Sequence, residues 1–307
     1  MNIANFTLRD IAEEAAKELL EKGVPAEVKD VKKENGQTLT GIMIGDRNVR
    51  PCVYVSERDS IYTVVQRSLM AYADLEVSDK LATAVDYVWD FEKVKLQLRP
   101  FVINYGRNKE MLEEKNLVFR QFLDLAVGVR IVLQQDHEGV ASIKVGEYFL
   151  EKWQKTADDV INQAIENHRK DMFFMPMDEL LGSLVKEMSE SSCDVAVDNL
   201  LSCGPVPLFG GFRIPMYVLS NTQKIDGAAF IADDVTIREV AKRLCVDEMY
   251  ILPSSRGEVL IVPNIIGVNG FDFQNMVADV NRTVLNASDF LSDSVYLYHN
   301  GQVRITA

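Results

Sequence analysis

The chain has 307 residues, of which 47% are hydrophobic and 26% charged, with a formal net charge of −13. This length and composition predict a globular protein of one large or two moderate domains. No apolar run reaches the roughly 18 residues of a membrane-spanning helix, and no basic segment followed by an apolar one begins the chain, so we expect a soluble cytoplasmic protein without a membrane partner.

The first hundred residues predict an N-terminal module of helices and a three-stranded meander. Apolar residues recur at helical spacing over residues 6–22, and Gly23 follows as a stop signal. Three short strand-like segments come next, and the polar turns between them, residues 34–37 and 45–47, suit hairpins. The predicted strands cover residues 26–31, 38–44 and 48–55, and the helices after them cover residues 61–73 and 80–94.

Pro100 marks the predicted start of a larger second module, residues 101–307. Its first part predicts strands at residues 101–104, 119–125, 127–133 and 139–145, and helices at residues 109–115, 147–155 and 156–167. Thr156 is the expected N-cap of the last of these helices.

A loop rich in glycine and proline, residues 202–211, separates this part from the C-terminal part. Strands are predicted there at residues 216–220, 227–231, 249–252 and 258–262, and helices at residues 236–244 and 271–281. A closing hairpin, residues 295–297 and 303–305, turns through Asn300-Gly301. The alternation predicts an α+β fold in which mixed sheets are flanked by helices.

Motifs for cofactors and metals are absent from the sequence. His137, His168 and His299 show no zinc-type spacing to a second ligand. Neither of the glycine-rich phosphate-binding patterns occurs. The four cysteines include no Cys-x-x-Cys pair, which is typical of buried thiols in a reducing compartment. We therefore expect no cofactor and no metal ion.

Residues 250–263 form the strongest candidate site, because polar groups stand there between two apolar runs. Ser254, Arg256 and Glu258 alternate and would share one side of an extended chain. If this side faces a pocket, Glu258 would serve as the general base of a hydrolase or transferase, with Arg256 and Ser255 orienting an anionic substrate. Ser254, Asn221 and Tyr250 are candidate binding residues.

A structural turn is the favoured explanation of the same stretch. Pro253 fixes one backbone angle, Gly257 relieves a tight backbone, and the serines can bond locally. Arg256 would then pair with Glu258 or with an aspartate of the following helix. A related case is Asp124, which lies within an apolar run and needs a partner, for which Arg120 and Arg130 are the candidates.

Several segments together resemble an uncharacterised domain-of-unknown-function family of Gram-positive gut bacteria, family 5688. The likeness runs through nearly the whole chain and implies a cytoplasmic bacterial protein, without implying an activity. The segments that carry it include Leu39-Thr-Gly41, Phe122-Leu-Asp-Leu-Ala126, Leu150-Glu-Lys-Trp153, Ala164-Ile-Glu-Asn167, Met216-Tyr-Val-Leu-Ser-Asn221 and Ile251-Leu-Pro-Ser-Ser255.

The middle of the chain also looks remotely similar to the YtpQ-like family. In that family's pattern, Pro-Ser-Ser-x-His-Glu, a histidine stands where this chain has Gly257. A mechanism that uses this histidine as base or ligand would therefore fail here. The departure favours a structural or binding role for residues 254–258.

The leading functional hypothesis is a cytoplasmic bacterial binding or regulatory protein that acts through protein or peptide contacts. The hydrolase or transferase built on Glu258 is one alternative. The other is an acidic DNA mimic with a carboxylate face on residues 158–198, since residues 151–307 contain 22 acidic and only 13 basic side chains. The acidic surplus disfavours direct nucleic-acid binding, because it repels phosphate backbones.

Overall fold

The structure, a computed structural model, describes residues 7–46, 50–77, 87–136, 139–182, 208–209, 212–223, 225–264 and 270–306. Helices and antiparallel strands build two units, Met1–Lys93 and Val94–Ala307, whereas the sequence suggested a boundary near residue 100. The predicted α+β class is confirmed. None of the helices within the described ranges combines the length and apolarity that a bilayer crossing requires.

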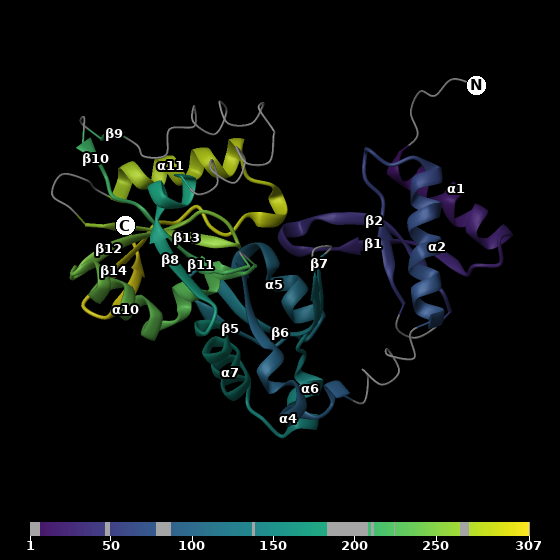
Figure 1. Cartoon of the computed structure of the whole chain (residues 1–307), viewed down its shortest axis with the longest axis horizontal. Helices are drawn as coiled ribbons and strands as arrows, with labels where there is room; N and C mark the ends of the chain where they lie inside the picture. The colour runs from purple at the N-terminus through teal and green to yellow at the C-terminus, as the bar shows by residue number, and fades with distance from the viewer. Residues whose placement is uncertain are drawn as a thin grey trace. The chain divides into compact units, whose positions relative to one another are not determined.

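The first unit is a three-stranded antiparallel meander with helices packed against it (Figure 1). Thr7 and Asp10 form a capping box at the start of its first helix, which satisfies two of the helix's free backbone donors. The first turn of the meander passes through Asn35 and Gly36, both at positive φ. The elements are α1 (Leu8–Glu21), β1 (Ala26–Lys32), β2 (Thr38–Ile44), β3 (Cys52–Tyr54) and α2 (Ile61–Val77), followed by α4 (Phe91–Val94) across the boundary.

One face of this meander forms the core of the unit. Ala12, Ala15 and Leu19 of α1 meet Ile42 and Ile44 of β2 there, and all five are fully buried. Part of the helix predicted at residues 80–94 lies outside the described residues, and the described part consists of a helical end at Tyr87 and Val88 and the short helix α4.

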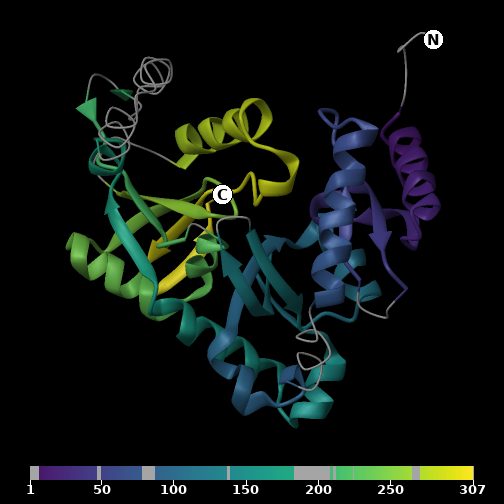
Figure 2. The same ribbon diagram turned by 45° about the vertical axis from the view of Figure 1, so that its right-hand side comes forward.

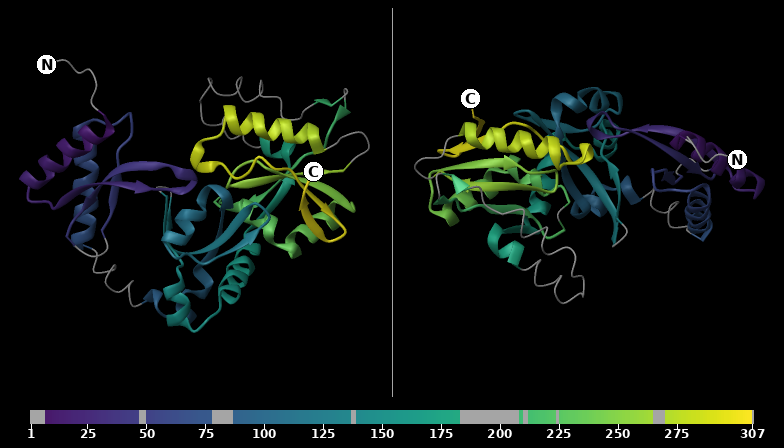
Figure 3. Two further views of the ribbon diagram at one scale, coloured as in Figure 1. Left: turned by 180° about the vertical axis from the view of Figure 1, so that it is seen from behind. Right: turned by 90° about the horizontal axis from the view of Figure 1, so that it is seen from above.

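The second unit begins with a four-stranded antiparallel sheet in which β6 pairs with β4, β5 and β7. Phe101 and Ile103 of β4 pack against α5, whereas Val102 contributes to the core that this sheet shares with the larger sheet, as the period of two requires. Helices α5 and α7 both contact the sheet (Figure 3). The elements are η2 (Lys95–Gln97), β4 (Leu98–Asn104), α5 (Tyr105–Glu114), β5 (Phe119–Phe122), β6 (Leu125–Asp136), β7 (Gly139–Lys144), α6 (Glu147–Trp153) and α7 (Ala157–Arg169).

The larger sheet of this unit has six antiparallel strands in the order β15-β14-β12-β13-β11-β8. Helix α11 covers one face and α10 with η3 covers the other (Figure 2). Tyr250 faces α11 and Ile251 faces α10, so β12 is buried on both sides. The elements are β8 (Met172–Pro176), β11 (Tyr217–Asn221), η3 (Gly227–Ala232), α10 (Asp234–Leu244), β12 (Glu248–Pro253), β13 (Glu258–Pro263), α11 (Gly270–Thr283), η4 (Ala287–Asp289), β14 (Tyr296–His299) and β15 (Gln302–Ile305).

Three expectations about this unit need correction. Every strand pair in the described ranges is antiparallel, so the sheets are not mixed. Residues 227–231 form the 3-10 helix η3 instead of a strand, because Ala228 through Ile231 are buried on all sides between the two sheets. A two-strand hairpin, β9 (Leu208–Phe209) with β10 (Phe212–Arg213), occupies part of the predicted loop, and β8 was not predicted.

Candidate functional site

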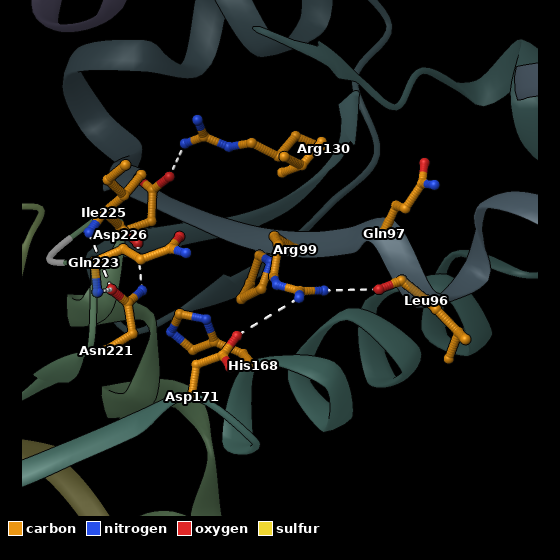
Figure 4. Close-up of a pocket in the computed structure, with 12 residues that line it drawn as sticks. Leu96, Gln97, Arg99, Arg130, His168, Asp171, Asn221, Gln223, Ile225 and Asp226 are labelled. Carbon is orange, nitrogen blue, oxygen red and sulfur yellow. Dashed lines mark hydrogen bonds and ion pairs between the residues drawn. The ribbon is translucent and has the colours of Figure 1, made fainter. Parts of the chain in front are cut away.

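A pocket of about 150 Å³ opens in the second unit where four segments distant in sequence meet (Figure 4). The segments are the start of β4 with η2, the middle of β6, the end of α7, and the connection between β11 and η3. We call it the His168 pocket. Its charged and hydrogen-bonding lining includes Arg99, Arg130, His168, Asp171, Asn221 and Asp226.

His168 is held in place by the residues on either side of it at the end of α7. The Asn167 side-chain nitrogen donates to the carbonyls of Lys95 and Leu98, at 2.6 and 3.1 Å. The Arg169 guanidinium donates two hydrogen bonds of 2.6 Å to the Asp233 carboxylate. These bonds fix the last turn of α7 to the start of β4 and to the N-terminus of α10.

The imidazole of His168 is buried at the pocket and carries an unused polar atom. The residue is 3% exposed, and its ring packs against that of Phe230 with centroids 4.1 Å apart and the ring planes tilted by 31°. Burial lowers the pKa of His168 to about 4, with Arg99 acting in the same direction, so the ring is neutral near pH 7. Its Nε2 atom has no hydrogen-bond partner among the described residues, although a neutral imidazole offers one donor and one acceptor.

Arg99 and Asp171 form a half-exposed ion pair beside this ring (Figure 4). Nη1 of Arg99 donates to the carbonyls of Leu96 and Leu98, at 2.9 and 3.0 Å. Nη2 lies 3.5 Å from the Asp171 carboxylate, and the two side chains are 33% and 43% exposed. The contact is longer than a typical charge-assisted hydrogen bond of about 2.8 Å, so the guanidinium is firmly placed while its ion pair is loose.

Asp226 forms the opposite wall and binds two arginines. Arg130 of β6 and Arg256 both contact its carboxylate, the latter at 3.0 Å, and the Asp226 side chain is only 4% exposed. Asp226 has a left-handed backbone with φ of 51°, a conformation that favours small polar residues in tight turns. The cluster therefore holds the connection between β11 and η3 against β6.

The predicted site at residues 254–258 supports this wall without lining the His168 pocket. The Arg256 backbone accepts a hydrogen bond from Ala228 N at 3.2 Å, and Gly257 O accepts one from Ser220 Oγ at 2.7 Å. The backbones approach so closely that a Cβ at Gly227 would lie 2.3 Å from Gly257 O. The Asp226 carboxylate, which Arg256 binds, comes from the preceding connection and was not among the partners predicted for it.

The other candidate residues are distributed around this loop. Ser254 Oγ donates to Glu258 Oε1 at 3.3 Å, and Ser255 Oγ accepts from Gly257 N at 3.0 Å. The role of Glu258 as a general base stays a prediction. Tyr250 is 8% exposed and packs against Phe273 of α11.

Asn221 is the predicted binding residue that lines the His168 pocket. Its Oδ1 accepts from the backbone nitrogens of Gln223 and Ile225, both at 3.1 Å, and its Nδ2 donates to Ile225 O at 2.6 Å. The side chain thus shapes the connection that carries Asp226.

The partners of Asp124 differ from those predicted. Its carboxylate accepts hydrogen bonds from Ser292 Oγ at 2.5 Å, Ser294 Oγ at 3.0 Å and the Tyr296 hydroxyl at 2.6 Å, instead of pairing with either predicted arginine. Burial, and then the nearby carboxylate, raise the pKa of Tyr296. The cluster ties the turn before β6 to the C-terminal sheet, which is a structural role.

Sequence reasoning did not assign His168, Arg99 or Arg130 to a functional site. A usable signal was present for His168, because it follows Ile161 and Ala164 at helical spacing on the buried face of α7. No cluster of three or more His, Cys, Asp or Glu side chains suited to a metal ion occurs within the described ranges. The acidic face suggested for residues 158–198 lies in part outside them.

Comparison with known proteins gives one match. Residues 7–300 match a family described as a family of unknown function (DUF5688). No curated protein and no solved structure matches the chain. The match extends over nearly the whole sequence and confirms the resemblance drawn from the sequence motifs. The chain therefore belongs to the DUF5688 family of unknown function.

Proposed function

We propose that this chain is a binding protein of the bacterial cytoplasm and that its ligand, a small polar molecule or the end of a peptide, enters the His168 pocket. The observation that supports this most directly is the buried Nε2 atom of His168, which no described residue contacts by a hydrogen bond. Leaving such an atom unsatisfied costs about 1–3 kcal/mol. A ligand with a matching polar group would recover this energy.

The side chains around His168 can form hydrogen bonds with a polar ligand. Arg99 and Arg130 supply guanidinium groups, and Gln97 and Gln223 add amides that can both donate and accept. The pocket has room for a few heavy atoms, which matches the end of a larger ligand or a small metabolite. Because neighbouring hydrogen bonds hold Asn167 and Arg169, the site between them is preorganised, which reduces the entropy lost on binding.

A thermal-shift screen with small polar compounds and short peptides tests the proposal. A ligand should raise the melting temperature of the wild type and have little effect on His168→Phe, which keeps an aromatic ring against Phe230 but removes both ring nitrogens. His299→Phe is the matched control, because His299 lies half-exposed on β14 and outside the pocket. The proposal fails if no compound stabilises the wild type, or if ligands stabilise His168→Phe equally well.

A further inference from the structure

We propose that the group recognised in the His168 pocket is a single carboxylate, belonging to a free small acid or to the chain end of a peptide, and that Arg99 and His168 hold it. This inference rests on the proposed function and specifies its ligand class. It follows from the charges that surround the pocket, from the loose ion pair at Arg99 and from the end of α7 that the pocket meets.

The charges on the pocket wall favour an anion. Two guanidinium groups, Arg130 of the lining and Arg256 behind it, contact the carboxylate of Asp226. The side chains of Arg130, Arg256 and Asp226 are 13%, 17% and 4% exposed, so water screens their charges poorly.

Arg99 can receive the carboxylate directly. Two backbone carbonyls already hold its Nη1, while its Nη2 contacts Asp171 at 3.5 Å. The carboxylate of Asp171 therefore binds Arg99 only weakly and competes with a ligand for it. An incoming carboxylate can approach the same edge of the Arg99 guanidinium at a shorter distance. The planar fork of arginine matches the two oxygens of a carboxylate.

His168 completes the site as a neutral hydrogen-bond partner. Arg99, Arg130, Asp171 and Asp233 are the charged groups that surround it. A neutral imidazole can donate its N–H to a carboxylate without taking up a proton. The pocket thus offers an anionic ligand one charged and one neutral donor.

The position of the pocket disfavours a phosphate group. Phosphate sites typically use the N-terminus of a helix, where free N–H groups and the helix dipole favour negative charge. This pocket instead meets the C-terminal end of α7 at His168, where the dipole is negative. A singly charged carboxylate is opposed less strongly by this end than a phosphate of higher charge.

Isothermal titration calorimetry near neutral pH with paired probes tests the ligand class. Acetate should bind at least about tenfold more tightly than acetamide, which has the same shape without the charge. N-acetyl-dialanine and its C-terminal amide form a second pair. Tighter binding of the peptide acid than of acetate would identify a peptide chain end as the source, and the reverse order would identify a free small acid.

Two variants test whether the carboxylate binds at Arg99. Arg99→Gln should weaken acetate binding by about tenfold or more, whereas Asp171→Asn should strengthen it by up to about fivefold, because a competitor for Arg99 is removed. Arg120→Gln and Asp234→Asn are matched controls on exposed side chains outside the pocket and should leave the affinity unchanged. Circular dichroism verifies that each variant is folded.

Three results would overturn the inference: acetamide binding as well as acetate, inorganic phosphate binding more tightly than acetate, or Asp171→Asn weakening acetate. In these cases the proposed function would stand if another polar compound still required His168 in the thermal-shift screen. Failure of every compound in both experiments would remove the proposed function itself.

Discussion

Mild acid should destabilise this protein through His168. Burial, with help from Arg99 and Arg130 and against a partial effect of Asp233, lowers the pKa of His168 from 6.5 to about 4. The unfolded chain takes up the proton at the ordinary pKa, so stability falls as the pH drops through 6.5 and stops falling near 4. At about 1.4 kcal/mol per pKa unit, the loss across the whole window is about 3 kcal/mol, of which about 2 kcal/mol is reached by pH 5.

Urea denaturation at about pH 7.5 and about pH 5 measures this loss. Other groups also titrate in this range, so the informative quantity is the difference between the wild type and His168→Phe, which has no imidazole at this position. Asp233, which faces the His168 ring, contributes little to the loss of stability between these two pH values. Although burial raises its pKa, the hydrogen bonds from Arg169 and Thr236 outweigh burial, and the pKa of Asp233 is lowered.

The wild type should lose about 2 kcal/mol more than His168→Phe between the two pH values. His299→Phe retains His168 and should keep most of the wild-type loss. Equal losses in the wild type and His168→Phe would show that the ring is not buried as described, and the case for an unsatisfied nitrogen in the pocket would fall with it.

Two further predictions concern the buried clusters around the site. Asp226→Asn leaves Arg130 and Arg256 without the carboxylate they share and should lower the free energy of unfolding by about 3–5 kcal/mol; a change below 1 kcal/mol in urea denaturation would mean that the cluster is hydrated. Tyr296→Phe removes one of the three hydroxyl donors to Asp124 and should cost about 1–3 kcal/mol by the same measurement, whereas an unchanged midpoint would contradict the structural role of that cluster.

The sequence predicted best those elements that depend on local chemistry. The turn at Asn300-Gly301 has both residues at positive φ, as expected of an Asn-Gly hairpin. Thr156 caps α7 with the predicted geometry. Prediction failed where tertiary burial decides the outcome, as in η3, whose continuous apolar run is typical of both a buried strand and a buried helical turn.

The site could not be predicted because its parts come from four segments that only folding brings together. Arg99 and Arg130 lie on β4 and β6 and face each other in register, but the sequence shows only two isolated arginines in apolar strands. What the sequence did indicate was that a charged residue in an apolar setting needs a partner. Asp124 and Arg256 followed that rule with unexpected partners.

His168 is also a polar residue in an apolar setting, but the fold does not supply a partner for its Nε2 atom among the described residues. The carboxylate of Asp124 receives three hydrogen bonds, so its burial is compensated within the fold, and the guanidinium of Arg256 binds the Asp226 carboxylate. The Nε2 atom of His168 is buried as well, yet it has no hydrogen-bond partner in the part of the chain that the structure describes. This atom lies on the buried face of a helix and adjoins a pocket. It is thus a stronger sign of a ligand than Ser254, Ser255 and Glu258, whose side chains bond to one another or to the neighbouring backbone.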